Sequence, residues 1–198
     1  MKKNTWIKGV NIWGECDVTC LNDLRDLEYL YLDGAKISGS LNLSNFPKLK
    51  YLSIFYNSKS FKNLGSCANC EFLDLSKWPS ENLEILNSFQ KLKTLKLAYG
   101  KLENLCGLEN CINLKRLYLY SFPKLTVIDS LKNIALSLEF FNIDKCRKIE
   151  NYDVFEEMRN LKSFYIFECN PVKNVSFISA MPKLEYAYIG VEVLDKNI

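Results

Sequence analysis

The feature that most constrains this chain of 198 residues is a phrase of four apolar positions that recurs about every 22 residues. Each copy has an apolar residue, two others, a second apolar residue, two others, and then two apolar residues that flank one variable residue. The third apolar residue of successive copies is Val10, Leu30, Leu52, Leu73, Leu95, Leu117, Phe141, Phe164 and Ala187. Because one copy cannot bury its apolar edge alone, the copies are expected to stack into a solenoid.

At these positions the chain resembles the leucine-rich-repeat family, whose pattern of Leu, any two, Leu, any, Leu, any two, Asn or Cys is matched between residues 7 and 190. The resemblance implies an α/β fold with a curved parallel β-sheet on the concave face and turns and short helices on the convex face. The family's polar turn residue is present as Asn57, Cys146 and Cys169. Other coils place different residues there, so the usual ladder of turn Asn side chains should be broken; these residues are Ala35, Trp78, Gly100 and Glu192.

One uninterrupted array predicts a single domain over residues 1–198, with residues 1–23 as an N-terminal cap and partial coil and residues 191–198 as a C-terminal tail. The N-terminus lacks the apolar stretch of about 7 to 15 residues that a signal peptide needs. No window approaches the roughly 20 apolar residues of a membrane span. We therefore expect a cytoplasmic chain with no membrane partner.

The eight cysteines fit the repeat better than they fit a metal site. Cys67, Cys70 and Cys111 replace leucines at core positions, where a small and weakly polar residue packs well. The chain has no histidine and no second cysteine pair that would complete a tetrahedral zinc site. Structural thiols are the expectation, and a site or bond between Cys16 and Cys20 is the alternative.

The absence of histidine also excludes the commonest catalytic arrangements, including Ser-His-Asp and Cys-His pairs. The best carboxylate pair, Asp74 and Asp144, should lie three strands apart, which is roughly 14 Å and too far for paired glycosidic carboxylates. The glycines are scattered singly, so no phosphate-binding loop is present. We expect a protein that is not an enzyme and that carries no cofactor and no metal.

The residues that flank the two strand leucines should point away from the core, because side chains in a strand alternate with period 2. Three such positions in each of nine coils give 27 face positions, of which 13 are aromatic, although aromatic residues make up 13% of the chain. The predicted binding residues on this face are Tyr29, Tyr31, Tyr51, Phe55, Phe72, Asp74, Lys96, Arg116, Tyr118, Tyr120, Phe140, Asp144, Tyr165, Phe167, Tyr186 and Tyr188.

Two explanations of the aromatic face remain open. Aromatic residues favour strands and stack on their neighbours, so packing alone is one explanation. The other is a binding surface, because aromatic anchors with few charges are typical of interface cores. The expected face of roughly 650 Å² is close to one side of a standard protein interface.

Single-stranded RNA or DNA could stack its bases on such a face, and the chain has a net charge of +3. The face itself carries three acidic residues against Lys96 and Arg116, whereas lysines such as Lys91 and Lys132 should lie elsewhere. Because the face lacks a row of basic residues that could bind phosphates, a protein partner is favoured over nucleic acid.

The chain is similar to small bacterial repeat proteins that act as immunity proteins, each of which neutralises a cognate toxin of a contact-dependent or other polymorphic toxin system. That resemblance implies a monomer that binds one toxin domain tightly. A cytosolic adaptor that binds host-cell proteins is the alternative. The residues expected at the centre of the interface are Tyr118, Tyr120, Phe140, Tyr165 and Phe167.

Overall fold

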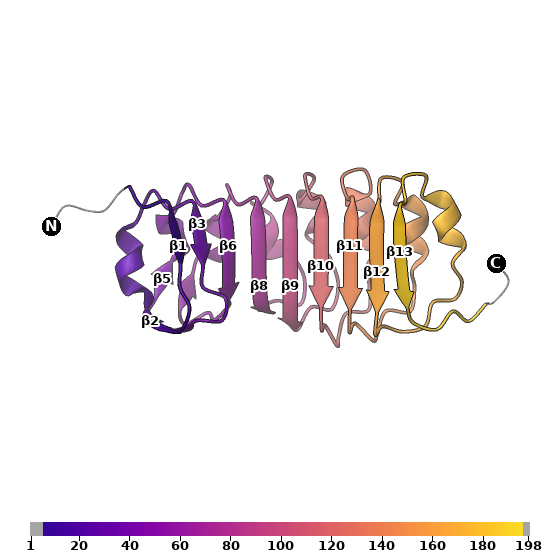
Figure 1. Cartoon of the computed structure of the whole chain (residues 1–198), viewed down its shortest axis with the longest axis horizontal. Helices are drawn as coiled ribbons and strands as arrows, with labels where there is room; N and C mark the ends of the chain where they lie inside the picture. Colours follow the sequence, from indigo (N-terminus) through magenta and orange to yellow (C-terminus); the bar gives the residue numbers. More distant parts are fainter. Residues whose placement is uncertain (1–5, 196–198) are drawn as a thin grey trace.

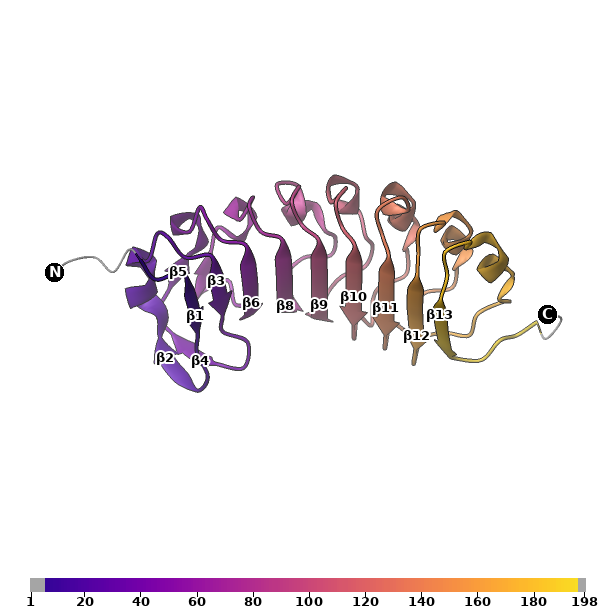
Figure 2. The same cartoon turned by 45° about the horizontal axis from the view of Figure 1, so that its top comes forward.

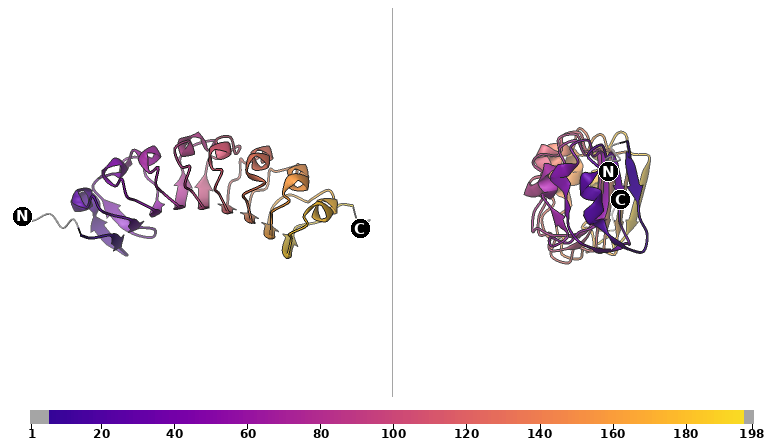
Figure 3. Two further views of the ribbon diagram at one scale, coloured as in Figure 1. Left: turned by 90° about the horizontal axis from the view of Figure 1, so that it is seen from above. Right: turned by 90° about the vertical axis from the view of Figure 1, so that its left-hand side faces the viewer.

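The computed structural model describes residues 6–195, which wind into a solenoid (Figure 1) that is arched when seen from above (Figure 3). Nine parallel strands follow the chain in order across one sheet. They are β1 (Gly9–Asn11), β3 (Tyr29–Tyr31), β6 (Tyr51–Phe55), β8 (Phe72–Trp78), β9 (Thr94–Gly100), β10 (Arg116–Tyr120), β11 (Phe140–Asp144), β12 (Ser163–Phe167) and β13 (Tyr186–Gly190).

The helices in the described residues are short 3-10 helices. They lie on the outer side of the arch, while the sheet lines the inner side (Figure 3). They are η1 (Val18–Asp23), η2 (Leu43–Asn45), η3 (Leu64–Ser66), η4 (Glu84–Leu86), η5 (Leu108–Asn110), η6 (Asp129–Ile134), η7 (Asp153–Glu157) and η8 (Ser176–Ala180). A coil of about 22 residues leaves room for only a short helix of three to six residues in each repeat, and 3-10 helices are common in such short pieces.

The predicted register is confirmed along the whole sheet. Val10 pairs with Leu30, and the same third apolar position continues through Leu52 and Leu73 to Ala187 at the other end. The predicted pairing also holds where the repeat is longer than 22 residues: Leu117 pairs with Phe141, 24 positions later in the sequence. The extra residues therefore lie in the loops, and the register of the strands is unchanged.

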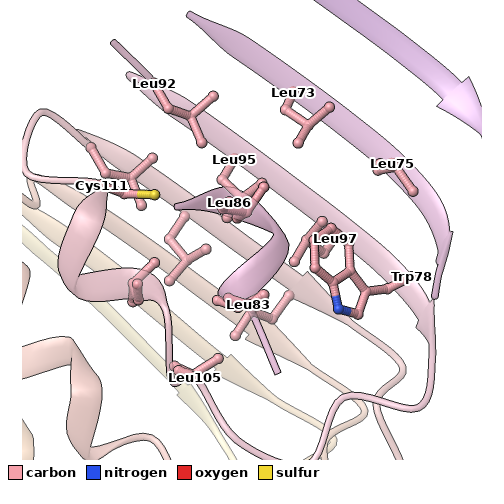
Figure 4. Close-up of a cluster of buried hydrophobic side chains, with 14 of the residues drawn as sticks. Leu73, Leu75, Trp78, Leu83, Leu86, Leu92, Leu95, Leu97, Leu105 and Cys111 are labelled. Atoms are coloured by element: carbon pink, nitrogen blue, oxygen red, sulfur yellow. The ribbon is translucent and has the colours of Figure 1, made fainter. Parts of the chain in front are cut away.

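The core is a single apolar cluster that runs the length of the solenoid. Figure 4 shows its central part, where Leu73 and Leu95 from the sheet face Leu83 and Leu86 from the outer side. All four side chains have no exposed surface. Each coil buries its apolar edge against the next coil, as a repeat protein requires.

The N-terminal coils carry two further small sheets that the sequence analysis did not anticipate. One pairs β2 (Glu15–Asp17) with β4 (Lys36–Ser38), and the other pairs β5 (Leu41–Asn42) with β7 (Phe61–Lys62). Figure 2 shows β2 and β4 side by side at the N-terminal end. These pairs rest on backbone hydrogen bonds between short segments that have no strong alternating pattern of their own.

The turn position is filled in a different way in each coil, as the sequence predicts. Asn57 is exposed and accepts a hydrogen bond from the amide of Lys59 within its own turn. Cys146 is buried and points its thiol at the carbonyl of Asp144. Trp78 is also buried, and its indole N–H donates to the carbonyl of Asn82. This tryptophan belongs to the core and not to a polar ladder.

Charged side chains form a ladder at the edge of the sheet where the strands begin. Glu139 lies between Lys115 and Lys162, at 3.0 Å and 2.8 Å, and therefore has an ion pair on each side. Lys50 pairs with Glu28 at 2.7 Å, and Lys93 pairs with Glu71 at the same distance. The sequence analysis did not predict these ion pairs, in which lysines of one coil reach glutamates of the neighbouring coil.

Candidate functional site

The concave face carries the predicted binding residues on one side of the sheet. The register aligns Phe72 with Thr94 and Tyr118 with Asn142, so the flanking residues of each strand continue one row from coil to coil. Their leucine neighbours point into the core, while Tyr29 and Tyr186 at the two ends remain about half exposed, at 47% and 50%. The period of 2 therefore separates face from core as expected.

The aromatic rings of the face form two stacked groups. In the N-terminal group, the ring centroids of Tyr29 and Tyr51 are 5.5 Å apart, and those of Tyr51 and Phe72 are 4.7 Å apart. Such separations are within the favourable range for aromatic pairs.

The C-terminal group continues the row from Tyr118. Its ring lies 4.8 Å from Phe140, which lies 5.4 Å from Tyr165, and Tyr165 lies 5.4 Å from Tyr186. Mutual stacking leaves Tyr118, Phe140 and Tyr165 only partly exposed. The central rings are therefore held in place by contacts with neighbouring rings.

Lys96 connects the two groups. Its Nζ atom lies 5.5 Å from the ring centroid of Phe72 and 5.2 Å from that of Tyr118. An ammonium group at this distance is attracted to the faces of both rings. The aromatic row thus runs from Tyr29 to Tyr186 with one cation in its middle.

Two acidic residues of the face, Asp74 and Asp144, lie in less polar surroundings than a solvated carboxylate. Burial raises the pKa of Asp74, and the nearby charge of Lys96 opposes this shift. Burial likewise raises the pKa of Asp144, with Lys145 opposing it. Asp74 lies on β8 and Asp144 on β11, three strands apart in the sheet, as expected.

An open pocket of about 300 Å³ lies at the C-terminal half of the face. It brings together four of the predicted aromatic residues and one predicted acid. Its lining consists of Tyr120, Asn142, Asp144, Tyr165, Phe167 and Tyr188. Phe55 and Arg116 lie elsewhere on the face; both are exposed, and Phe55 is covered in part by Lys77, whose Nζ is 5.5 Å from its ring centroid.

Residues at or beside this surface that are not in the predicted binding set include Trp13, Tyr99, Ser53 and Asn142. Trp13 is 70% exposed and lies with its ring 6.0 Å from Tyr31, and its place in the repeat could have identified it. Tyr99 is exposed and follows Ala98, the last face position of β9. Its backbone φ is positive, at 56°. Ser53 and Asn142 occupy face positions and hold buried oxygen atoms without a hydrogen-bond partner. No sequence signal marks these last two.

The cysteines are free thiols in the described residues. Cys67 and Cys111 are buried, and burial raises the pKa of both thiols to about 12. Within residues 6–195, no group of three or more His, Cys, Asp or Glu side chains could hold a metal ion. No helix in the same residues is long and apolar enough to cross a membrane.

No protein-family model matches the sequence. A plant protein described as disease resistance protein RPP4, from Arabidopsis thaliana, is 26% identical over 163 residues. The match covers 80% of this chain but 14% of the plant protein, so the chain spans a small part of that relative's length.

Solved structures with the same architecture come from bacteria and plants. Internalin C2 of Listeria monocytogenes has a TM-score of 0.64 at 18% identity, covering 91% of this chain and 80% of the internalin. The ectodomain of the Arabidopsis thaliana receptor kinase GASSHO1/SCHENGEN3, solved with CASPARIAN STRIP INTEGRITY FACTOR 2, has a TM-score of 0.65 at 15% identity, covering 96% of this chain and 25% of the receptor chain. Together with the strand register and the coil length, these likenesses show that the chain has the leucine-rich-repeat solenoid fold.

Proposed function

We propose that this chain is a non-enzymatic protein-binding module and that the concave aromatic face is its interface. The observation that carries the proposal is the aromatic row from Tyr29 to Tyr186, which extends across most of the sheet and stays partly exposed. Monomeric proteins rarely expose a contiguous apolar patch beyond a few hundred Å² without a partner. Rigid Tyr and Phe side chains at the centre of a patch are the usual hot spots of protein interfaces.

The solved receptor ectodomain supports a protein or peptide partner, because that repeat domain was solved in complex with CASPARIAN STRIP INTEGRITY FACTOR 2. The charges of the face favour the same class over nucleic acid. Lys96 is held between two rings, and Arg116 is the other basic residue at the face positions, against Asp74 and Asp144. A nucleic-acid groove would need a row of Lys and Arg for the phosphates.

The partner class that we propose is a cognate toxin domain, which the chain would neutralise in the cytoplasm. Such a role requires tight and specific binding by a surface with no chemistry of its own, and a stacked aromatic row provides such a surface. Binding to one partner at about nanomolar affinity or tighter fits this role, whereas an adaptor would bind several partners more weakly.

The test of the interface is a double variant, Tyr118→Ala with Tyr165→Ala, compared with wild type for binding to a purified candidate toxin by calorimetry. Each substitution should weaken binding by about 1 to 4 kcal/mol, since central aromatic side chains dominate interface energies. The matched control removes two exposed apolar side chains outside the sheet, Ile112→Ala with Leu136→Ala, and should bind as wild type does. Thermal melting of both variants separates loss of binding from loss of fold.

The biological role is tested by growth. In a bacterium that expresses the candidate toxin, wild type and the control variant should restore growth, and the Tyr118, Tyr165 variant should restore it poorly. Full protection by that variant would contradict the proposed interface. Binding to several unrelated host proteins, with no protection against the toxin, would favour the adaptor role. Binding to RNA that falls steeply with salt would contradict a protein partner.

A further inference from the structure

The pocket at the C-terminal half of the face differs from the rest of the aromatic row because polar acceptors lie among the rings. Tyr120, Tyr165, Phe167 and Tyr188 line a space of about 300 Å³ together with Asn142 and Asp144. The rings of Phe167 and Tyr188 are 6.1 Å apart, and those of Tyr165 and Tyr188 are 6.3 Å apart. This volume is at the lower end of small-ligand pockets, so it suits one side chain better than a whole ligand.

Two oxygen atoms at this pocket have no hydrogen-bond partner. The Oδ1 atoms of Asn142 and Asp144 are both buried, and no donor of the described residues reaches either of them. The two residues are separated by one position on β11, so their side chains share the concave face. A buried acceptor without a donor costs about 1 to 3 kcal/mol, and more if it is charged. A rotation of either side-chain group that turns its Oδ1 atom toward the pocket would let an occupant supply the missing donor.

The charge of the Asp144 carboxylate is only partly compensated, because the nearby charges of Lys145 and Arg147 do not outweigh its burial. The nearby cationic side chains are directed to another acid: Arg147 lies 2.9 Å from Glu168, and Lys145 lies 3.8 Å from it. No ion pair to Asp144 forms within residues 6–195. A carboxylate in partly buried surroundings favours a cation over a neutral donor.

We infer that this pocket receives an arginine side chain of the protein partner. The inference rests on the proposed function, because it assigns the chemistry of one partner residue at the proposed interface. A guanidinium group is planar and presents five N–H donors in a fork, so it can reach two separate acceptors and still lie against aromatic rings. An ammonium group is a compact point charge and is more strongly hydrated. An anion or an apolar side chain would leave both Oδ1 atoms without donors.

The test uses an arginine derivative, Nα-acetyl-L-arginine N-methylamide, titrated into the isotope-labelled full chain and followed by NMR. The matched neutral probe is the citrulline derivative, which keeps the shape and loses the charge, and the lysine derivative supplies an ammonium. We expect saturable shifts at the six lining residues with the arginine derivative. Binding should be at least about 5-fold weaker for the lysine derivative and undetectable for citrulline, given the charge-assisted donors.

Two variants make the assignment specific. Asp144→Asn should weaken binding of the arginine derivative at least about 5-fold, because it removes the charge and keeps the shape. Asp33→Asn, an isosteric change on the same face outside the pocket, should change it less than about 2-fold. Equal binding of the arginine and citrulline derivatives, or shifts outside the pocket only, would overturn the inference. Equal binding of the lysine derivative would overturn the choice of arginine.

The outcome is separable from that of the proposed function. If the arginine derivative binds the pocket but Tyr118 and Tyr165 do not affect binding of the toxin, the pocket assignment stands and the proposed function fails. If the toxin binds through the face while Asp144→Asn changes neither that affinity nor any shift with the arginine derivative, the pocket assignment alone is wrong.

Discussion

Leu95 lies beside Leu117 across strands β9 and β10, and both side chains are completely buried. They occupy the same position in two of the most regular coils, so each is part of the other's packing environment. Replacing either by Ala should lower the free energy of unfolding by about 2 to 5 kcal/mol through lost burial and a residual cavity. Urea denaturation measures the change, and Leu136→Ala, at a site 81% exposed, is the control. A loss below about 1 kcal/mol at Leu95 would contradict this packing.

Gly107 is the glycine whose replacement should be most harmful. Its φ of +100° is in the left-handed region, and an added Cβ would overlap the backbone of Leu83 and Glu84. Gly107→Ala should therefore destabilise the fold by at least about 1 to 3 kcal/mol. Gly65→Ala is the matched control, because a Cβ there would meet the carbonyl oxygen of Ile85 at an ordinary 3.6 Å. Equal melting temperatures for the two variants would show that the strain is absent.

The cysteines should differ in their reactivity toward a thiol reagent according to how deeply they are buried. Cys20 and Cys106 are exposed, whereas Cys67, Cys111 and Cys146 are buried with pKa values raised to about 12. A thiol reagent near pH 8 should label the exposed pair quickly and the buried thiols only after unfolding, because the thiolate is the reactive form. The melting temperature should be the same with and without reductant, and elemental analysis should find no stoichiometric zinc. Zinc near one per chain would contradict the structural reading of the thiols.

Glu139 should give the protein part of its sensitivity to acid. Hydrogen bonds from Lys162 and Lys115 lower its pKa from 4.5 to about 2 in the folded state. A carboxyl group with a lowered folded-state pKa stabilises the fold above its ordinary pKa, and that contribution is lost as the pH falls from about 4.5 to about 2. Because the three side chains are 35% to 49% exposed, the contribution should be at most about 1 kcal/mol.

The measurement is urea denaturation of wild type and Glu139→Gln at neutral pH and near pH 2 to 3. The variant should be less stable than wild type at neutral pH and nearly equal to it at the acidic end. Glu150→Gln, at an exposed site outside the ladder, is the control. A constant difference between the Glu139 variant and wild type at both pH values would show that the ion pairs are not responsible.

The sequence by itself determined the repeat register and the division between core and face. Leu30, Leu117 and Phe164 could be assigned to the core because the apolar spacing of a repeat is a local property of the chain. Tyr118 and Tyr165 could be assigned to the concave face because side chains alternate along a strand. The ion pair of Lys93 with Glu71 was missed, since it depends on how far side chains reach between coils.

Only the tertiary structure decided which face residues form a site. Asn142 and Asp144 occupy the same place in the repeat pattern as other face residues. Their Oδ1 atoms are nevertheless buried without a hydrogen-bond donor, unlike the polar side-chain atoms of most face residues. Their environment is set by Tyr120, Tyr165 and Tyr188 from three different coils. The burial of an acceptor depends on the packing and curvature that bring neighbouring coils together, and a pattern within one coil contains no information about either.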